Sequence, residues 1–475
     1  METNILRGGS ILNKKFKMIG LGLLAFSLAS SPVLAEDKPV KDNPSEQAFD
    51  NAIVKRIDAN NIYSHVSELS ESIGIRVAGT PNEEAAVQYI ADQYRQYGLD
   101  VEIQPFNIQT YEDAKEVELS VDGLSENFSP TAFRYSPSTP DDGITGEILY
   151  VGLGESKDLD GVDLTGKIAL IERGTIPFVN KVSNAKEKGA AAVIIFNNVD
   201  GVLNSSLSSS GEYIPTIGIT KENGENILGL LNEGNSVSGT VKVIGGGMVT
   251  KQSHNVIATK KAHPKHDTGQ IIYVGSHHDS VPGSRGASDN ASGVGVNLEI
   301  ARVISNMQTD TEVRFITFGA EEQGLLGSYH YTSTLTDDEV ERSVGMFNFD
   351  MVGSKNAGEM IMFTVDGKTN TVTNLGASAS HRVFNELTYG HVGRSDHQPF
   401  HQAGIPAAVF SYAPLEPEYH QPTDTIDKIS IEKMENVAKV VGASVFQVAR
   451  VDTPALENAR VAPVEIEPEF EDRPL

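Results

Sequence analysis

The chain has 475 residues, of which 39% are hydrophobic and 21% are charged, as in a soluble globular protein of two or more domains. Its 64 acidic residues outnumber its 38 basic residues, and the formal net charge of -26 argues against nucleic acid as a partner. The sequence contains no cysteine, which excludes disulfides, thiolate metal ligands and a cysteine nucleophile.

The first 35 residues have the organisation of a secretory signal peptide. Basic residues precede an apolar run from Met18 to about Ala29, and the small-residue sequence Val33-Leu34-Ala35 follows it. The run is short for a membrane span, although an uncleaved anchor remains the alternative. We therefore expect residues 1–35 to be removed, a secreted, extracellular protein without stable membrane insertion, and a loose polar leader over residues 36–50.

The next part of the chain predicts a helix, a strand and then a change of texture. Residues 83–98 place apolar side chains on one helical face and end on a glycine, a common helix stop. Leu99–Phe106 alternates as a strand does. Between residues 130 and 248, short strands broken by glycine surround one helix at Phe178–Gly189. We expect residues 130–248 to form a small, strand-rich domain of their own.

After residue 255 predicted strands alternate with helical stretches. The strands are expected at Gln270–Gly275, Glu312–Phe318, Val344–Phe349 and Ala407–Tyr412. This alternation predicts an α/β fold, a mixed, mostly parallel sheet with helices on both faces. Residues 51–129 and 249–451 would form this discontinuous domain, with residues 130–248 as an insertion. Residues 452–475 are an acidic, proline-rich tail, too poor in large apolar residues to fold alone.

Acidic and imidazole groups follow the ends of these strands, where open parallel sheets gather their ligands. Each group alone is weakly specific, because exposed acids are common. Together, two histidines and several carboxylates at one sheet edge would repel each other without a cation, and nitrogen and oxygen ligands suit zinc or a similar divalent ion. The groups are His277 and Asp279 in SHHDS, Asp289 in GASDNASGV, Glu321 and Glu322 in FGAEEQGLLGS, Asp350 after SVGMFNF, and His420 in EYHQPTDT.

In this order, SHHDS, ASDNASG, GAEEQGLLGS, FNFDMVG and YHQPTDT resemble metallopeptidase family 28 of clan MH, the secreted leucyl-type aminopeptidases. Within the insertion, DLTGKIALIERG, NAKEKGAAAVIIFN and IPTIGIT resemble a protease-associated domain. The resemblance implies a zinc-peptidase fold with two zinc ions per chain. It also implies an aminopeptidase, an enzyme that hydrolyses the first peptide bond of peptides with a free N-terminus. The N-terminal residue that it releases would be apolar and leucine-like.

The resemblance also implies a ligand set. His277 and Asp350 would bind one zinc, and Glu322 and His420 would bind the other. Asp289 would bridge the two ions, as a pair of metals requires. The nucleophile would be a metal-bound hydroxide.

Three further residues receive roles from the resemblance. Asp279 would orient the first histidine ligand, Glu321 would be the general base, and Tyr419 would donate to the developing oxyanion. A packing role for Tyr419 stays open. Adjacent glutamates at a strand end point in different directions, so one can face a metal and the other the water. A cis peptide bond is expected between Asp289 and Asn290.

Three other functions stay open. A non-catalytic binding protein would be expected to lack a ligand or the base, and none is missing here. Glutaminyl cyclases that resemble this family rely on one zinc and a tryptophan-lined pocket, whereas this chain has no tryptophan. A carboxypeptidase of the same clan would need cationic groups for the substrate carboxylate, and no clear arginine cluster lies beside the motifs.

Overall fold

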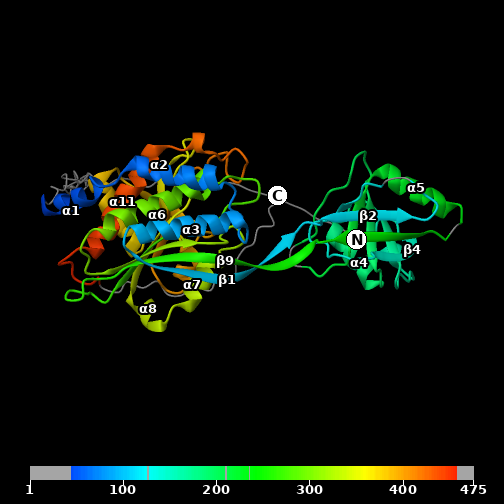
Figure 1. The fold of residues 1–475 in the computed structure, drawn as a ribbon, viewed down its shortest axis with the longest axis horizontal. Helices are drawn as coiled ribbons and strands as arrows, with labels where there is room; N and C mark the ends of the chain where they lie inside the picture. Colours follow the sequence, from blue (N-terminus) through cyan, green and yellow to red (C-terminus); the bar gives the residue numbers. More distant parts are fainter. Residues whose placement is uncertain (1–43, 126–127, 209–210, 235, 457–475) are drawn as a thin grey trace, which may run out of the picture. The chain divides into compact units, whose positions relative to one another are not determined.

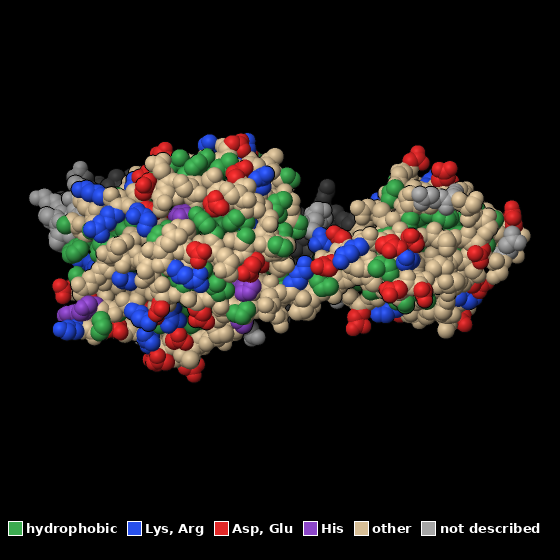
Figure 2. All heavy atoms as spheres, in the orientation of Figure 1, with side chains coloured by type: hydrophobic (Ala, Val, Ile, Leu, Met, Phe, Trp, Pro, Cys, Tyr) green, Lys and Arg blue, Asp and Glu red, His purple; other side chains and the backbone are tan. Residues whose placement is uncertain are grey.

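The computed structural model describes residues 44–125, 128–208, 211–234 and 236–456, whose strands form two sheets (Figure 1). The expected signal peptide lies outside the described residues, as do residues 36–43 of the expected leader and 457–475 of the expected tail. No helix in the described ranges is both long and apolar enough to cross a bilayer. On the face seen in Figure 2, acidic and basic side chains are interspersed over the surface.

The first sheet has eight strands in the order β1-β9-β11-β10-β12-β15-β13-β14. Its central strands β11, β10, β12 and β15 are parallel, whereas β1, β9 and β13 pair antiparallel with their inner neighbours. This confirms the mixed sheet expected from the sequence. The strands are β1 (Asp100–Glu112), β9 (Gly247–Lys260), β10 (Ile271–His277), β11 (Glu312–Phe318), β12 (Ser343–Phe349), β13 (Glu359–Thr364), β14 (Thr388–His391) and β15 (Ala407–Ala413).

Helices cover both faces of this sheet because successive side chains of a strand point to opposite sides. Ile272 and Val274 of β10 join a larger core, and Ile271 and Tyr273 join a smaller one. The larger core contains residues of α2 (Ala59–Ser67), α3 (Pro81–Gln96), α6 (Gly293–Ser305), α9 (Thr371–Val383) and α11 (Ile431–Ala449); the smaller contains residues of α7 (Leu326–Thr334) and α10 (His397–Gln402), with α8 (Asp337–Arg342) packed beside it.

Helix α1 (Pro44–Val54) begins inside the segment expected to be a loose leader, so that expectation is wrong for residues 44–50. Asp50 binds Arg382, with 2.6 Å between Oδ2 and Nε, and the guanidinium of Arg450 lies 3.7 Å from the centre of the Phe49 ring. These partners are hundreds of residues away in the sequence. The local pattern therefore gave no sign that the segment is ordered.

The second sheet has seven strands in the order β2-β8-β4-β5-β6-β7-β3. Its strands β4, β5, β6 and β7 are parallel, and helices α4 (Phe178–Glu187) and α5 (Lys221–Asn232) belong to separate cores on its two faces. The strands are β2 (Glu116–Val121), β3 (Thr131–Ala132), β4 (Ile144–Tyr150), β5 (Ile168–Glu172), β6 (Ala192–Phe196), β7 (Thr216–Ile219) and β8 (Ser238–Ile244).

The second sheet begins earlier in the chain than residue 130, where we expected the insertion to start. Strand β2 precedes that residue and pairs with β8, near the far end of the insertion. The pairing partner is distant in sequence, so the texture of the sequence did not reveal it. In the first sheet, β1 and β9 pair from Asp100 opposite Thr259 to Glu112 opposite Gly247. The chain thus leaves and re-enters this sheet at neighbouring positions, as domain insertions commonly do.

Candidate metal centre

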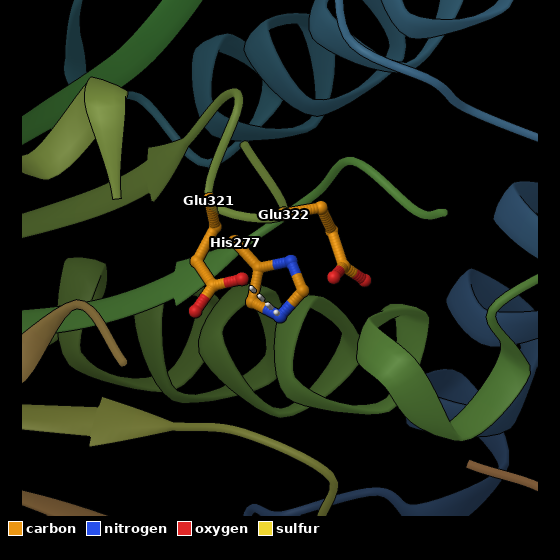
Figure 3. Close-up of side chains that lie close together, drawn as sticks. All are labelled: His277, Glu321 and Glu322. Atoms are coloured by element: carbon orange, nitrogen blue, oxygen red, sulfur yellow. Dashed lines mark ion pairs between the residues drawn. The ribbon is translucent and has the colours of Figure 1, made fainter. Parts of the chain in front are cut away.

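The candidate ligands gather at the carboxyl ends of three adjacent parallel strands. β10 ends at His277, Asp350 directly follows β12, and Glu321 and Glu322 follow β11 after two residues. The register sets His277 opposite Phe318, the last residue of β11. Because these strands are parallel neighbours, the loops that follow them begin at the same sheet edge. Figure 3 shows the side chains of His277 and the two glutamates converging there.

Asp289 lies between the two predicted histidine ligands. Its Oδ1 is 3.3 Å from Nε2 of His277, and its Oδ2 is 3.3 Å from Nε2 of His420. Each carboxylate oxygen therefore faces a different imidazole, which is the arrangement that a carboxylate shared by two cations requires. The peptide bond between Asp289 and Asn290 is cis, as expected.

Each histidine also faces a second carboxylate. Oδ1 of Asp350 is 3.4 Å from Nε2 of His277, and Oε2 of Glu322 is 3.0 Å from Nε2 of His420. Three sets of three residues each offer ligand-type atoms that lie within 4.8 Å of one another. Two of them, His277 with Asp289 and Asp350, and Asp289 with Glu322 and His420, share only the central aspartate. The third set is His277, Glu321 and Glu322.

The electrostatics of the cluster fit divalent cations. Burial raises the pKa of Glu322 to about 7, and repulsion from Asp289 is the second contribution. Although burial opposes it, contact with Asp289 and Glu322 raises the pKa of His420 to about 10. Oε1 of Glu322 is buried and has no hydrogen-bond partner among the residues that the structure describes. Without a metal ion, the neighbouring carboxylates repel one another and are partly neutralised by bound protons. Divalent cations would neutralise them instead, and zinc accepts the nitrogen and oxygen ligands that the cluster offers.

Asp279 is buried beside His277 and joins two of the strand ends. Its Oδ1 lies 3.5 Å from Nδ1 of His277. The two oxygens also accept the backbone N–H groups of Glu321 at 3.1 Å and Glu322 at 3.3 Å. The carboxylate of Asp279 thus contacts Nδ1 of His277, whereas Asp289 contacts Nε2. It also fixes the backbone of the glutamate loop, the segment after β11 that contains Glu321 and Glu322.

The glutamate loop turns sharply after β11 in a way that its sequence allows. A Cβ at Gly319 would lie 2.3 Å from Oγ of Ser253, so only glycine fits there. Ala320 has a φ of 53°, and this turn separates the strand from the glutamates. Oε2 of Glu321 lies 4.0 Å from Nε2 of His277, and burial raises the pKa of Glu321 well above its usual range. The adjacent glutamate contacts the other histidine, so the two side chains serve different parts of the cluster.

Comparison with known proteins places this geometry in a family. Residues 255–445, which include every candidate ligand, match peptidase family M28, and residues 129–227 match the PA domain. Aminopeptidase YwaD of Bacillus subtilis (strain 168) is 40% identical over 403 residues, which are 82% of this chain and 85% of the relative. This chain belongs to peptidase family M28. The family and the PA domain identified from the motifs are both confirmed.

Solved structures of M28 relatives share the fold. An aminopeptidase from Aneurinibacillus sp. strain AM-1 is 51% identical, with 88% of this chain and 98% of that chain covered and a TM-score of 0.62. BSAP, described as a zinc aminopeptidase from Bacillus subtilis, is 39% identical, with 84% and 97% covered and a TM-score of 0.63. The chain is thus similar, over most of its length, to two proteins described as aminopeptidases, one of them as a zinc aminopeptidase.

Tyr419 lies beside the cluster in this M28 chain. Its ring stacks on that of His420, with 3.8 Å between ring centres and an interplanar angle of 28°. His420 itself has a φ of 58°, in the left-handed region. Tyr419 therefore packs against His420, as the alternative left open for it required. The catalytic role of its hydroxyl stays a prediction.

Two further supporting residues were not predicted. Oγ of Ser395 donates a hydrogen bond of 2.7 Å to Oδ2 of Asp350. Asp424 accepts the backbone N–H groups of Ser288 at 2.8 Å and Asp289 at 3.0 Å. The sequence did contain a signal for Asp424, which lies in the same motif as the second histidine.

Proposed function

We propose that this chain is a zinc aminopeptidase that binds two zinc ions and removes the N-terminal residue from peptides. The observation that supports this most directly is the position of Asp289 between His277 and His420, with one oxygen 3.3 Å from each imidazole. Each imidazole also faces a second carboxylate, so the cluster offers two overlapping sites of the composition that zinc prefers. The similarity to proteins named zinc aminopeptidases supports the same conclusion.

The proposed ligand roles follow the two sets of neighbouring atoms. His277 and Asp350 would hold one ion. Glu322 and His420 would hold the other, and Asp289 would be shared by both. When bound, the ions polarise the scissile carbonyl and lower the pKa of the attacking water.

Glu321 is the proposed general base. Its carboxylate belongs to neither of the two sets that share Asp289, although it forms a third set with His277 and Glu322, and it lies 4.0 Å from Nε2 of His277. Burial raises its pKa well above the usual range, which favours taking a proton from water and passing it to the leaving amine. Asp279 is proposed to orient the imidazole of His277, and Tyr419 to donate to the developing oxyanion.

The proposed substrate is a peptide with a free N-terminus. Carboxylates outnumber cationic groups around the cluster, which favours a ligand that brings a positive ammonium group. A preference for apolar, leucine-like first residues is proposed from the family resemblance. We also propose secretion, because residues 1–35 have the organisation of a signal peptide.

A substrate panel tests the proposal. The zinc-loaded protein is incubated with aminoacyl-anilides, with free peptides and with the same peptides N-acetylated. We expect release of N-terminal residues, fastest for leucine-like ones, and no cleavage once the amine is acetylated. C-terminal release from acetylated peptides would instead indicate a carboxypeptidase, and cyclisation of N-terminal glutamine a cyclase. No turnover by zinc-loaded protein would indicate a binding protein. Each of these three results would overturn the proposal.

A further inference from the structure

Arg76 is a fully buried arginine in the loop that precedes α3. Within the described part of the chain it forms no ion pair at 4.0 Å or less; its guanidinium instead donates five hydrogen bonds to backbone carbonyls. Nε binds His278 at 2.8 Å, Nη1 binds Leu69 at 3.0 Å, Gly74 at 2.8 Å and Arg285 at 2.7 Å, and Nη2 binds Gly286 at 2.9 Å. A buried arginine that binds only backbone groups holds chain segments in place.

Three of these carbonyls belong to one loop, residues 278–286, which connects the ligand His277 to the bridging Asp289. The guanidinium binds the first residue of this loop and its last two residues. The backbone of Arg76 binds Ser280 as well, through an N–H to Oγ bond of 3.0 Å and a bond of 3.2 Å from the Ser280 N–H to the Arg76 carbonyl. A single residue therefore contacts the loop at its start, near its start and at its end.

The contact at the end of the loop is close. Gly286 has a φ of 57°, and a Cβ there would lie 3.0 Å from Nη2 of Arg76 and 2.2 Å from the carbonyl oxygen of Asp289. Glycine at this position thus lets the guanidinium and the bridging residue approach the same backbone. Directly after this loop, Asp424 accepts the N–H groups of Ser288 and Asp289.

The charge of Arg76 also faces the cluster. Burial lowers its pKa to about 10, opposed by Asp279, Asp424, Asp289 and Glu322, so the side chain remains a cation at neutral pH. A permanent positive charge near these carboxylates lowers their mutual repulsion before any metal binds.

We propose that Arg76 is a positioning residue of the metal centre, which holds loop 278–286 so that His277 and Asp289 are in place when the ions bind. The inference rests on the zinc sites of the proposed function. Residues that support metal ligands typically change metal affinity by about 10–100-fold when they are replaced. The planar fork of arginine matters here, since a lysine ammonium cannot reach the same set of carbonyls.

Zinc titration of the metal-free protein tests the inference, by competition with a chromogenic chelator. We expect Arg76→Met to weaken at least one of the two zinc sites by about tenfold or more and to change the absorption spectrum of the cobalt-substituted protein. Arg76→Lys keeps the charge and should recover only part of the affinity. Arg382→Met is the control, because Arg382 also donates five hydrogen bonds, to Asp50, Ser378 and Gln447. It should lower the unfolding temperature and leave both zinc affinities unchanged.

Unchanged zinc affinities and an unchanged cobalt spectrum in folded Arg76→Met would overturn the inference. If that variant does not fold, Arg76→Lys and Ser280→Ala take its place, and wild-type affinity in both would overturn it equally. A wild-type protein that is fully active with one zinc ion would instead refute the two-zinc function; weaker binding of that ion by Arg76→Met would still support the role of Arg76.

Discussion

The two sheets of the molecule both contain four parallel strands, and they differ in the residues at the carboxyl ends of those strands. In the first sheet, β10 ends on His277 and β12 is followed by Asp350. In the second, β4, β5 and β6 end on Tyr150, Glu172 and Phe196. In the described ranges, all three groups of possible metal ligands lie at the first sheet. Both sheets thus bring the carboxyl ends of parallel strands together at one edge. Whether that edge forms a functional site depends on the side chains that lie there.

Both sheets also bury a cation that binds backbone carbonyls near their strand ends. In the second sheet this is Lys181 of α4, whose Nζ binds the carbonyls of Leu153 and Glu172. Burial lowers the pKa of Lys181. In the first sheet Arg76 does the same for a loop that leads to a proposed ligand. Near both sheets, a buried cation thus donates hydrogen bonds to backbone carbonyls. Beside the second sheet this cation has a structural role, and beside the first sheet we propose that it also positions metal ligands.

The largest expected effect separates glutamates at the two sheets. Glu321→Gln should lower turnover by about two to four powers of ten, because the general base is lost, while zinc content stays near wild type. Glu322→Gln should weaken zinc binding. Glu172→Gln, at a strand end of the second sheet, should leave both unchanged. Metal analysis and steady-state kinetics on the three variants check this. If Glu321→Gln lost zinc and Glu322→Gln retained it, the two roles would be reversed.

A smaller effect is expected from the buried lysine. Lys181→Met removes the side chain that donates to the carbonyls of Leu153 and Glu172, which should lower the free energy of unfolding of the domain that contains the second sheet by about 1–3 kcal/mol. Turnover of small anilides and zinc affinity should stay at wild-type values. Chemical denaturation followed by circular dichroism, together with the kinetic assay, measures both quantities. If Lys181→Met lowered zinc affinity as much as is expected for Arg76→Met, the proposed difference between a structural Lys181 and a positioning Arg76 would be wrong.

The smallest expected effect is a dependence of stability on pH that belongs to the first domain. Residues 113–246 contain no histidine, whereas His65 of α2 is buried, with Nδ1 2.7 Å from the hydroxyl of Tyr89. Burial lowers the pKa of His65 to about 4. As the pH falls below about 6.5, the unfolded chain gains a proton here that the folded chain does not, so stability is lost. From pH 7 to 5.5 this loss should be about 1 kcal/mol.

The variant His65→Gln isolates this contribution. Denaturation of both proteins at the two pH values gives the loss of unfolding free energy for each, and the wild type should lose more by that amount. Equal losses in wild type and variant would mean that His65 titrates in the folded protein as it does in the unfolded chain.

The features that the sequence predicted well are those whose evidence is local. Strand β11 lies at Glu312–Phe318 as expected, because its apolar alternation and its flanking turns are contiguous. The candidate ligands were singled out because they end a strand or lie in the loops that follow one, and parallel strands bring these loops to the same edge of the sheet. Two of the sets of neighbouring residues contain the ligands that the family resemblance implied, and their roles as metal ligands stay predictions.

The features that were missed depend on distant partners. Arg76 stands in SIGIRVAGT without any nearby acid, and its role appears only when residues 278–286 fold around it. Strand β2 is defined by pairing with β8, and α1 by contacts to Arg382 and Arg450. No periodicity within a short window encodes such contacts.

The central claim is that two overlapping metal sites share Asp289, and a zinc titration of metal-free protein with parallel activity measurements tests it most directly. We predict that activity reaches its maximum at about two zinc ions per chain. We also predict that His420→Ala retains one ion with strongly reduced turnover, since the set of His277, Asp289 and Asp350 remains. Full turnover of the wild type at one ion per chain, with no further change on adding a second, would contradict the account.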